Sequence, residues 1–532
     1  MEGMKGISLL LLLLLAPIPA SFSSAFSVLG ESKAQFMIQG IEDVLGRTFD
    51  YIIVGGGAGG CSLTATLSQR HSVLLVERGG SPYGNPLIEE EKRFGFAFIQ
   101  TDQFTSISQR FVSEDGVGNQ RGRVLGGSTA INAGFYGRAS RGYINRAGWD
   151  PELVREAYEW VESKIVFRPS LRRRPSRTRW QAVAAEGMVE EGIRPFNSFT
   201  LEHIVGTKVG GSIFDVRGRR HTAADLLGAG NPEKITVLLN ATVQNIIFDD
   251  SPGDGKPPKA RGIRFIRSNG NPGKFYEVYL NLPKDSSGLL SRGEVILCAG
   301  ALGSPQILLL SGIGPKEHLM QFNITPLVDA REVGQSMQDN PTIRAFLNYS
   351  SHALSKNLLQ LPDPPKVAGI VKGNRILMET TLSYASFNTT IRVSLAVKLA
   401  YPISRGSLRL VSVDPRQNPS VKFNYLVKEK DLDECTRMVR LLDRVARSRS
   451  VTAFLERRQS ILPTSISKEM LRDFCKQRVA TIYHYHGGCL VGSVVDRDYR
   501  VMGVEGLRVV DGSTFLDSPG TNPMATVMML GR

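Results

Sequence analysis

Two histidines separated by one residue, His484 and His486, carry the side chains with which this chain could move a proton at neutral pH. An imidazole can accept a hydroxyl proton, so either ring is a candidate general base. On a β-strand, residues i and i+2 share a face, and the pair could instead hold a metal ion. The other five histidines are scattered and supply no evident third ligand. The glycines that follow, Gly487 and Gly488, are typical of a turn packed against a ring.

A glycine-rich segment far from these histidines has the pattern of a dinucleotide-binding site. Residues 50–60 read D-Y-I-I-V-G-G-G-A-G-G, an apolar run followed by Gly55, Gly57 and Gly60. We expect a strand, a tight turn and a helix whose N-terminus presents backbone N–H groups to a pyrophosphate. A second apolar run ends at Glu77, where a ribose-binding carboxylate belongs. No lysine follows the glycines, so the pattern predicts a dinucleotide site and not a nucleotide-triphosphate loop.

A second segment of small residues spans 122–138 and reads G-R-V-L-G-G-S-T-A-I-N-A-G-F-Y-G-R. Its glycines suit a backbone brought against a planar ligand, with Asn132 as a polar anchor. An ordinary turn with Ser128 as helix N-cap is the alternative, and composition alone does not choose between them. Ala130 replaces the second glycine of G-x-S-x-G, which excludes a serine-hydrolase elbow.

Length and charge restrict the class of protein. The 532 residues, 42% of them hydrophobic, are enough for a large core and two domains. The formal net charge of +15 would suit a nucleic-acid partner, but the chain carries no nucleic-acid motif, and we predict none. Basic residues are concentrated at 172–179, a run that we interpret as a solvated surface insertion.

The N-terminus has the layout of a secretory signal peptide, which we place at residues 1–25. Lys5 precedes an apolar stretch that is too short to span a membrane, and small residues follow at a candidate cleavage site. We therefore expect an exported protein without a transmembrane segment. Export makes four N-x-S/T sequons candidate glycosylation sites. They are Asn240, Asn323, Asn348 and Asn388.

The chain has five cysteines, an odd number. Cys61 and Cys298 lie in apolar, motif-bearing segments and are expected to be buried thiols. Cys435 and Cys475 lie in polar segments with helical patterns, and they are the candidate disulfide of an exported protein.

Several long motifs in order resemble the glucose–methanol–choline (GMC) flavoprotein oxidoreductases. They are the glycine turn with Glu77, residues 122–132, residues 293–315, and the C-terminal segments 483–489, 510–513 and 519–523. The resemblance covers residues 48–532. Within the family, the chain is most similar to the plant HOTHEAD-like and (R)-mandelonitrile-lyase-like group, through residues 205–212, 219–224 and 399–406.

This resemblance implies FAD, not NAD, as the cofactor. The adenosine and pyrophosphate would lie on the glycine turn and Glu77, with the backbone near Val243 passing the adenine. Asp511 and Gly512 match residues near the ribityl chain and pyrophosphate. The residues expected at FAD are Gly55, Gly57, Ala58, Gly60, Glu77, Arg123, Val124, Gly127, Ser128, Asn132, Val243, Asp511, Gly512, Asn522 and Pro523.

The resemblance also implies a reaction. His484 matches the family's flavin-facing histidine, and Asn522 matches its partner across the reacting carbon. An alcohol would give its hydroxyl proton to His484 and a hydride to flavin N5, while the protein orients the substrate. A long-chain hydroxy acid is one substrate class that the plant group implies. The sequence leaves the electron acceptor and the oligomeric state open.

Two other functions remain open. In the related hydroxynitrile lyases, a second histidine stands at the position of Asn522, and a cyanohydrin is cleaved without redox change. Asparagine cannot exchange a proton at neutral pH, which favours oxidation, although His486 could serve a lyase instead. The alternative outside enzymes is a catalytically inactive, secreted flavoprotein.

The implied fold is α/β, and α+β overall. A Rossmann-type FAD-binding domain would comprise residues 48–140, 205–320 and 485–532, and a substrate-binding domain with an antiparallel sheet would comprise 141–204 and 321–484. The chain departs from the family in a short 341–399 segment, in Met524 where plant members have Gln, and in ending at Arg532, where members continue into a closing helix. These departures leave open whether the substrate domain is complete and whether the enzyme is active.

Overall fold

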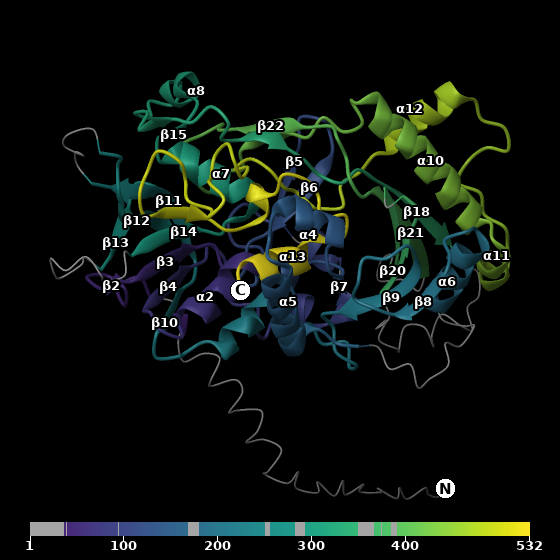
Figure 1. Ribbon diagram of the computed structural model, residues 1–532, viewed down its shortest axis with the longest axis horizontal. Helices are drawn as coiled ribbons and strands as arrows, with labels where there is room; N and C mark the ends of the chain where they lie inside the picture. Colours follow the sequence, from purple (N-terminus) through teal and green to yellow (C-terminus); the bar gives the residue numbers. More distant parts are fainter. Residues whose placement is uncertain are drawn as a thin grey trace, which may run out of the picture.

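The computed structural model describes residues 37–38, 40–93, 95–99, 101–168, 180–249, 256–281, 293–348, 366–373, 375–384 and 391–532. The expected signal peptide, the basic run at 172–179 and Asn388 lie outside these residues. The described chain forms two sheet-centred parts, which lie at the left and right of Figure 1.

A six-stranded sheet carries the glycine turn, and each of its neighbouring strand pairs is parallel. In spatial order its strands are β1 (Met37–Ile38), β10 (Ile235–Leu238), β4 (Val73–Val76), β3 (Tyr51–Val54), β14 (Glu294–Leu297) and β24 (Leu507–Val509). Strand β4 is buried at all four residues, as a parallel sheet covered on both faces requires.

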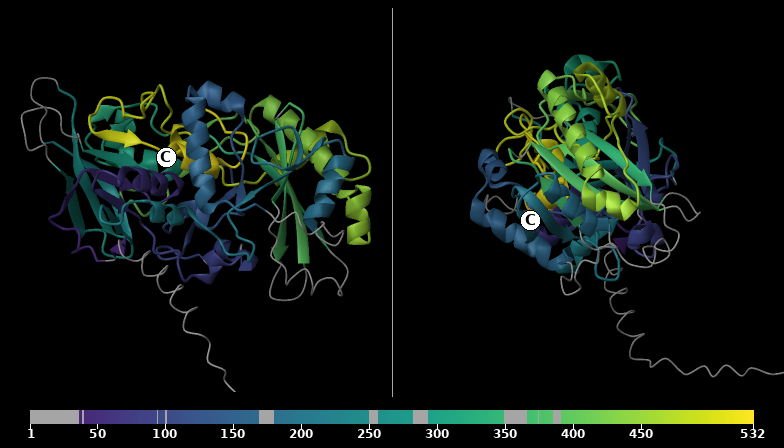
Figure 2. Two further views of the ribbon diagram at one scale, coloured as in Figure 1. Left: turned by 60° about the horizontal axis from the view of Figure 1, so that its bottom comes forward. Right: turned by 90° about the vertical axis from the view of Figure 1, so that its right-hand side faces the viewer.

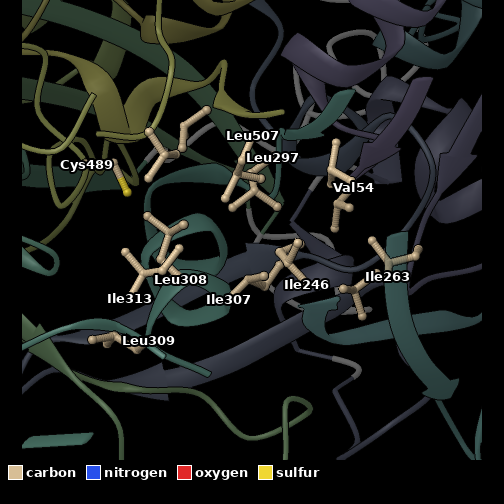
Figure 3. Close-up of a cluster of buried hydrophobic side chains, with 14 of the residues drawn as sticks. Val54, Ile246, Ile263, Leu297, Ile307, Leu308, Leu309, Ile313, Cys489 and Leu507 are labelled. Atoms are coloured by element: carbon tan, nitrogen blue, oxygen red, sulfur yellow. The ribbon is translucent and has the colours of Figure 1, made fainter. Parts of the chain in front are cut away.

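Alternate residues of these strands enter two different cores. Ile53 packs with the side of α2 (Ala58–Leu67), α5 (Pro151–Ile165) and α13 (Pro523–Leu530). Val54 packs on the opposite side with α7 (Gly300–Leu310), and Figure 3 shows this second cluster around Ile307 and Leu308. The β3–turn–α2 unit agrees with the strand, turn and helix expected around residues 50–60, and β14 and α7 lie within the second motif segment, residues 293–315.

A four-stranded sheet adjoins the second core. Its order is β11 (Ala241–Phe248), β12 (Ala260–Arg267), β13 (Phe275–Leu280) and β2 (Thr48–Phe49). The apolar segment 235–248 is divided into β10 and β11 at Asn240, where φ is +56°. Strands β10 and β11 therefore enter different sheets.

The second part is built on a seven-stranded sheet. Its order is β18 (Thr342–Asn348), β21 (Ile391–Leu399), β20 (Ile376–Tyr384), β19 (Lys366–Ile370), β9 (Gly206–Ser212) and β7 (Phe135–Tyr136), with β8 (Phe196–Phe199) beside β9. The pairs are antiparallel except β8–β9. The fold class is confirmed: a Rossmann-type part with a second part on an antiparallel sheet. Strands β7 and β9 belong to this sheet although their residues fall within the expected FAD-domain ranges, and the domain boundaries stay a prediction.

Helices cover the side of this sheet that faces away from the parallel sheet (Figures 1 and 2). They are α6 (Trp180–Glu190), α10 (Glu429–Ala446), α11 (Arg449–Leu455) and α12 (Lys468–Arg478). Helix α10 buries Leu432, Met438 and Leu442, whose spacing places them on one face. The short 341–399 segment supplies strands β18 to β21, so the sheet is continuous through its described residues.

Smaller elements complete the described chain. They are α3 (Pro86–Glu89), α4 (Arg141–Ala147), α8 (Lys316–Met320), β5 (Ser108–Val112), β6 (Gly118–Gly122), β15 (Ile313–Gly314), β16 (Val328–Asp329), β17 (Gln335–Met337), β22 (Gly406–Arg409) and β23 (Ser420–Lys422). None of the helices among the described residues combines the length and the apolar content needed to cross a membrane.

All five cysteines are buried free thiols. Cys61 and Cys298 lie in the cores beside the glycine turn, as expected. Cys435 on α10 and Cys475 on α12 lie on the apolar faces of their polar helices. The hydrogen bond with Cys475, together with burial, raises the pKa of the Cys435 thiol. The structure thus places the two thiols in contact but unbonded, and their disulfide stays a prediction.

The candidate glycosylation sites differ in setting. Asn240 and Asn323 are exposed, each with φ of +56°. Asn348 is the last residue of β18. Glycosylation stays a prediction at all four sequons.

Candidate active site

A cavity of about 480 Å³ is lined by both parts of the molecule. Its lining includes Gly55, Gly57, Ala58, Glu77, Gly127, Ser128, Asn132, Val243, Asp511, Gly512, Asn522, Pro523 and His484 among the residues that the sequence singled out. Arg344, Glu379, Ser394 and Ala396 line it from the seven-stranded sheet. The cavity therefore joins the dinucleotide motif to the residues expected to handle the proton.

The glycine turn leaves open space where a dinucleotide phosphate would lie. Gly55 has φ of +105°, and a Cβ there would be 2.5 Å from the Cys298 carbonyl oxygen. A Cβ on Gly57 would meet no atom closer than 4.0 Å, so this position faces the cavity. Gly57 caps α2 without a side-chain hydrogen bond to the helix. The first N–H groups of a ten-residue helix thus remain available to an anion.

Glu77 closes the turn at the end of β4. Its Oε2 accepts a hydrogen bond from Gly56 N at 2.9 Å, and its Oε1 accepts one from Gly79 N at 2.8 Å. Burial raises the pKa of this carboxyl. Each carboxylate oxygen retains acceptor capacity for a ribose hydroxyl on the cavity side.

Asp511 joins the C-terminal segment to the start of α7. Its Oδ2 accepts from Gly300 N at 2.9 Å and from Ser304 Oγ at 2.5 Å, and its Oδ1 accepts from Ser513 N at 2.8 Å. Burial raises the pKa of Asp511. These bonds hold Asp511 and Gly512 on the cavity wall, and their contact with FAD stays a prediction.

Three predicted cofactor residues do not line the cavity: Gly60, Arg123 and Val124. Arg123 instead donates from Nε to the Ser106 carbonyl at 2.9 Å and from Nη1 to the Gln103 carbonyl at 2.6 Å. Its guanidinium is occupied in anchoring that loop. Val124 is buried in a small separate core.

Gly60 has a packing role, and two neighbouring arginines take the place expected for Arg123. Gly60 serves packing, because a Cβ there would be 2.0 Å from the Gly55 carbonyl oxygen. Arg78 and Arg121 line the cavity in place of Arg123, and both donate to Gln109 Oε1. Sequence reasoning named neither arginine, although each directly adjoins a motif.

Ser128 is not a helix N-cap. Its Oγ accepts from Gly122 N at 3.1 Å, and the short 3-10 helix Gly127–Ala130 begins after Gly126. A Cβ on Gly127 would be 2.8 Å from Gly57 Cα. The segment is therefore folded against the glycine turn, which agrees with a backbone brought close to a planar ligand.

Asn132 has a fixed side-chain orientation. Its Oδ1 accepts from Gly134 N at 2.9 Å and from Arg220 Nη1 at 3.0 Å. Its Nδ2 is 3.0 Å from Met524 Sδ, a weak acceptor. Asn132 therefore presents its NH₂ group, and not its carbonyl oxygen, to the cavity side.

His484 is a buried, uncharged imidazole with a neighbour at each ring nitrogen. Its Nε2 is 3.4 Å from Asn522 Nδ2, and its Nδ1 is 3.1 Å from Lys398 Nζ. Its backbone N–H donates to Asp339 Oδ1 at 2.9 Å. Burial holds the pKa of His484 well below its usual range, and the positive charge of Lys398, followed by His486 and Arg344, lowers it further.

His486 does not share the cavity with His484. Residues 483–485 form no strand and His486 makes only an isolated bridge to Gln338, so the condition for the i, i+2 argument, a regular strand, is not met. The Nδ1 of His486 contacts the His484 carbonyl at 2.9 Å, and its Nε2 has no partner among the described residues. Burial lowers the pKa of His486 to about 4. No cluster of three metal-ligating side chains occurs in the described part of the chain.

Two comparisons of sequence profiles decide the family. Residues 49–342 and residues 402–531 each match a profile described as GMC oxidoreductase. The chain belongs to the GMC oxidoreductase family.

Relatives of this GMC oxidoreductase include proteins named for different activities. Protein HOTHEAD of Arabidopsis thaliana is 42% identical, with 91% of this chain and 87% of that protein covered. The (R)-mandelonitrile lyase-like protein of the same plant is 42% identical over 91% and 88%. Sinalpyl alcohol oxidase Nec3 of Nesocodon mauritianus is 40% identical over 91% and 87%.

Solved structures agree on the fold. Formate oxidase superposes with a TM-score of 0.73 at 19% identity, covering 91% of this chain and 97% of that one. Pyridoxine 4-oxidase from Mesorbium loti gives the same TM-score and coverage at 22% identity. FAD is the cofactor of this GMC oxidoreductase. The uncapped α2 terminus, the open space at Gly57 and the Glu77 carboxylate fit its pyrophosphate and ribose.

The structure adds three charged residues that sequence reasoning missed. Lys398 on β21 is 0% exposed, and Glu379 on β20 and Arg344 on β18 line the cavity. Burial lowers the pKa of Lys398 to about 8, against the attraction of Glu379 and Asp339. The signal in the sequence is a lone charge within an apolar strand, as in V-S-L-A-V-K-L.

Proposed function

We propose that this GMC oxidoreductase oxidises the CH–OH group of an alcohol, with His484 as the proton acceptor and Asn522 as its orienting partner. The observation that carries the proposal is the approach of Asn522 Nδ2 to His484 Nε2 in a cavity that continues to the FAD motif. An amide at this position can hydrogen bond to an oxygen but cannot exchange its proton at neutral pH.

The residues of this chain would divide the work as follows. His484 Nε2 receives the hydroxyl proton, because an uncharged imidazole nitrogen with a lone pair is a general base. Asn522 Nδ2 donates to the oxygen as negative charge develops on it. The bound FAD supplies a hydride acceptor for the carbinol hydrogen. Burial of His484 keeps bulk water from the base.

The substrate class rests on the plant group. A primary or secondary alcohol, including a long-chain hydroxy acid, is the proposed substrate. Phe98 and Tyr483 stack at 5.3 Å between ring centroids on the cavity wall, and Phe346 adds a third aromatic ring. These rings offer an apolar surface to the hydrocarbon part of such an alcohol. The signal-peptide pattern supports action outside the cell.

Hydroxynitrile lysis is the second candidate. It is favoured by the 42% identity to the (R)-mandelonitrile lyase-like protein. It is opposed by Asn522, and by the orientation of His486, whose ring does not line the cavity. Of the described histidines, His484 alone lines the cavity, so no second imidazole is present there to act as an acid or base.

Anaerobic mixing of purified holoenzyme with a panel of alcohols tests the proposal. We expect loss of the oxidised-flavin absorbance with at least one alcohol and appearance of the matching carbonyl product. Cyanide release from mandelonitrile without flavin bleaching would establish the lyase instead. Bound FAD with neither reaction would identify an inactive flavoprotein.

A further inference from the structure

Both ring nitrogens of His484 face nitrogen groups. Lys398 Nζ is 3.1 Å from Nδ1, and Asn522 Nδ2 is 3.4 Å from Nε2. An ammonium and an amide NH₂ are both donors, whereas a neutral imidazole has one N–H and one lone pair. His484 can therefore accept a hydrogen bond from only one of these two neighbours. Its own N–H can be satisfied only if the other neighbour becomes an acceptor.

Lys398 is the neighbour that can change from a hydrogen-bond donor to an acceptor. The amide of Asn522 also hydrogen bonds to the buried Glu379, so its NH₂ group has two acceptors to satisfy, and turning its oxygen toward the carboxylate is unfavourable. A lysine that loses its proton gains a lone pair. Then Nδ1–H donates to Lys398, and Nε2 keeps its lone pair toward Asn522 and the substrate.

We propose that Lys398 sets the tautomer of His484. Charged Lys398 donates to Nδ1 and leaves the ring proton on Nε2, where it blocks proton acceptance from an alcohol. Uncharged Lys398 accepts from Nδ1–H and frees Nε2 as the base. Lys398 is thus a positioning residue that acts through His484, and the inference rests on the proposed oxidation.

The surroundings of Lys398 allow it to exist uncharged. The side chain is 0% exposed, and no carboxylate lies within salt-bridge distance of its Nζ in the described residues. Burial lowers its pKa to about 8, which places the change within the working range of many enzymes. The charged and titratable groups around this pair are Glu379 on β20, Arg344 on β18, Lys208 on β9, and Asp339, His203 and His486.

The proton balance closes within the pair. The alcohol O–H proton moves to His484 Nε2, while the Nδ1 proton moves to the Lys398 amine. The step ends with a neutral His484 carrying Nε2–H and with a charged Lys398. The two electrons leave with the carbon-bound hydrogen, as in the proposed oxidation. Lys398 must release its proton before the next turnover.

Two substitutions at one position give opposite expectations. Wild-type kcat/KM should rise with pH through an apparent pKa near that of Lys398. In Lys398→Met the charge is lost, so the rise of kcat/KM near the pKa of Lys398 should disappear. A rise at lower pH, set by the pKa of His484, should remain. Lys398→Arg keeps a permanent donor on Nδ1, and kcat/KM should fall at every pH, on the order of 100-fold, the size of a lost general base. A purely structural role predicts the reverse order, with arginine the milder change.

A readout independent of turnover is the ¹⁵N chemical shift of the histidines. In ¹⁵N-histidine-labelled holoenzyme, the His484 signal, assigned by its loss in His484→Gln, should switch tautomer without gaining charge near pH 8. The switch should be absent in Lys398→Met. Lys366→Met is the matched control, since Lys366 is also buried in the seven-stranded sheet but pairs with Glu91 at 2.6 Å.

The outcomes separate the two proposals. A tautomer switch without oxidation of any alcohol would support the Lys398 inference and contradict the proposed function. Oxidation with no switch, or a Lys398→Met profile that keeps the wild-type limb, overturns the inference. FAD content and Tm report folding of each variant. If Lys398→Arg does not fold, the Lys398→Met profile and the ¹⁵N titration decide.

Discussion

Asn522 Nδ2 lies 3.4 Å from Nε2 of His484, although the two residues are 38 positions apart. Asn522 immediately precedes α13, and His484 lies in an irregular segment between α12 and the parallel sheet. The contact brings an uncharged base and a fixed amide donor to one side of the cavity. The proposed chemistry depends on this pair.

Asn522→His should change the reaction and not only its rate. A second imidazole at this position supplies an exchangeable proton, which alcohol oxidation does not require and cyanohydrin cleavage does. We expect lower flavin bleaching by alcohols and new cyanide release from mandelonitrile. Asn522→Leu is the control, because it removes the donor without adding a base. Equal cyanide release from both variants would contradict this assignment.

His484→Gln should abolish reduction of the flavin while FAD remains bound. Glutamine keeps hydrogen-bonding capacity but cannot accept the hydroxyl proton, so kcat should fall about 100-fold or more. Stopped-flow flavin reduction under anaerobic conditions measures this. His71→Gln, just before β4 and outside the cavity lining, should reduce flavin at the wild-type rate. Unaltered reduction in His484→Gln would remove His484 from the mechanism.

Gly57→Ala and Gly55→Ala should separate cofactor binding from folding. A Cβ at Gly57 projects into open space with no atom closer than 4.0 Å, and its φ of −90° suits any residue. This variant should keep the Tm of the apoprotein and lose FAD. A Cβ at Gly55 would be 2.5 Å from a backbone oxygen at φ of +105°, so Gly55→Ala should lower the Tm of the apoprotein itself. Matching losses of Tm in both variants would contradict the distinction.

The contact between Cys435 and Cys475 should become a disulfide in protein exported through an oxidising compartment. Such a bond typically contributes about 2–4 kcal/mol to the free energy of unfolding. Mass spectrometry of alkylated protein, before and after reduction, counts the free thiols. We expect three alkylated cysteines before reduction, namely Cys61, Cys298 and Cys489, and five after it. Five free thiols in unreduced secreted protein would show that the pair remains unbonded.

The sequence predicted the elements whose signals are local. The apolar run before Gly55 and the spaced glycines specify strand, turn and helix, because backbone conformation and burial there depend on neighbours in sequence. The same holds for Val73–Val76 and Glu77. Several motifs in order indicated the family, and the resemblance to that family in turn implied FAD and the pairing of His484 with Asn522.

Only the tertiary structure decided which side chains meet. Arg123 and Arg121 are two positions apart, yet one anchors a loop and the other lines the cavity. Arg121 lies on β6, whereas Arg123 lies beyond the end of that strand and so does not follow its alternation of faces. His484 lines the cavity and His486 does not, in a segment that forms no regular strand, where His486 makes an isolated bridge to Gln338. Lys398 reaches His484 from a different sheet, 86 positions away. Such contacts depend on non-local strand register and on burial, which no run of neighbouring residues specifies.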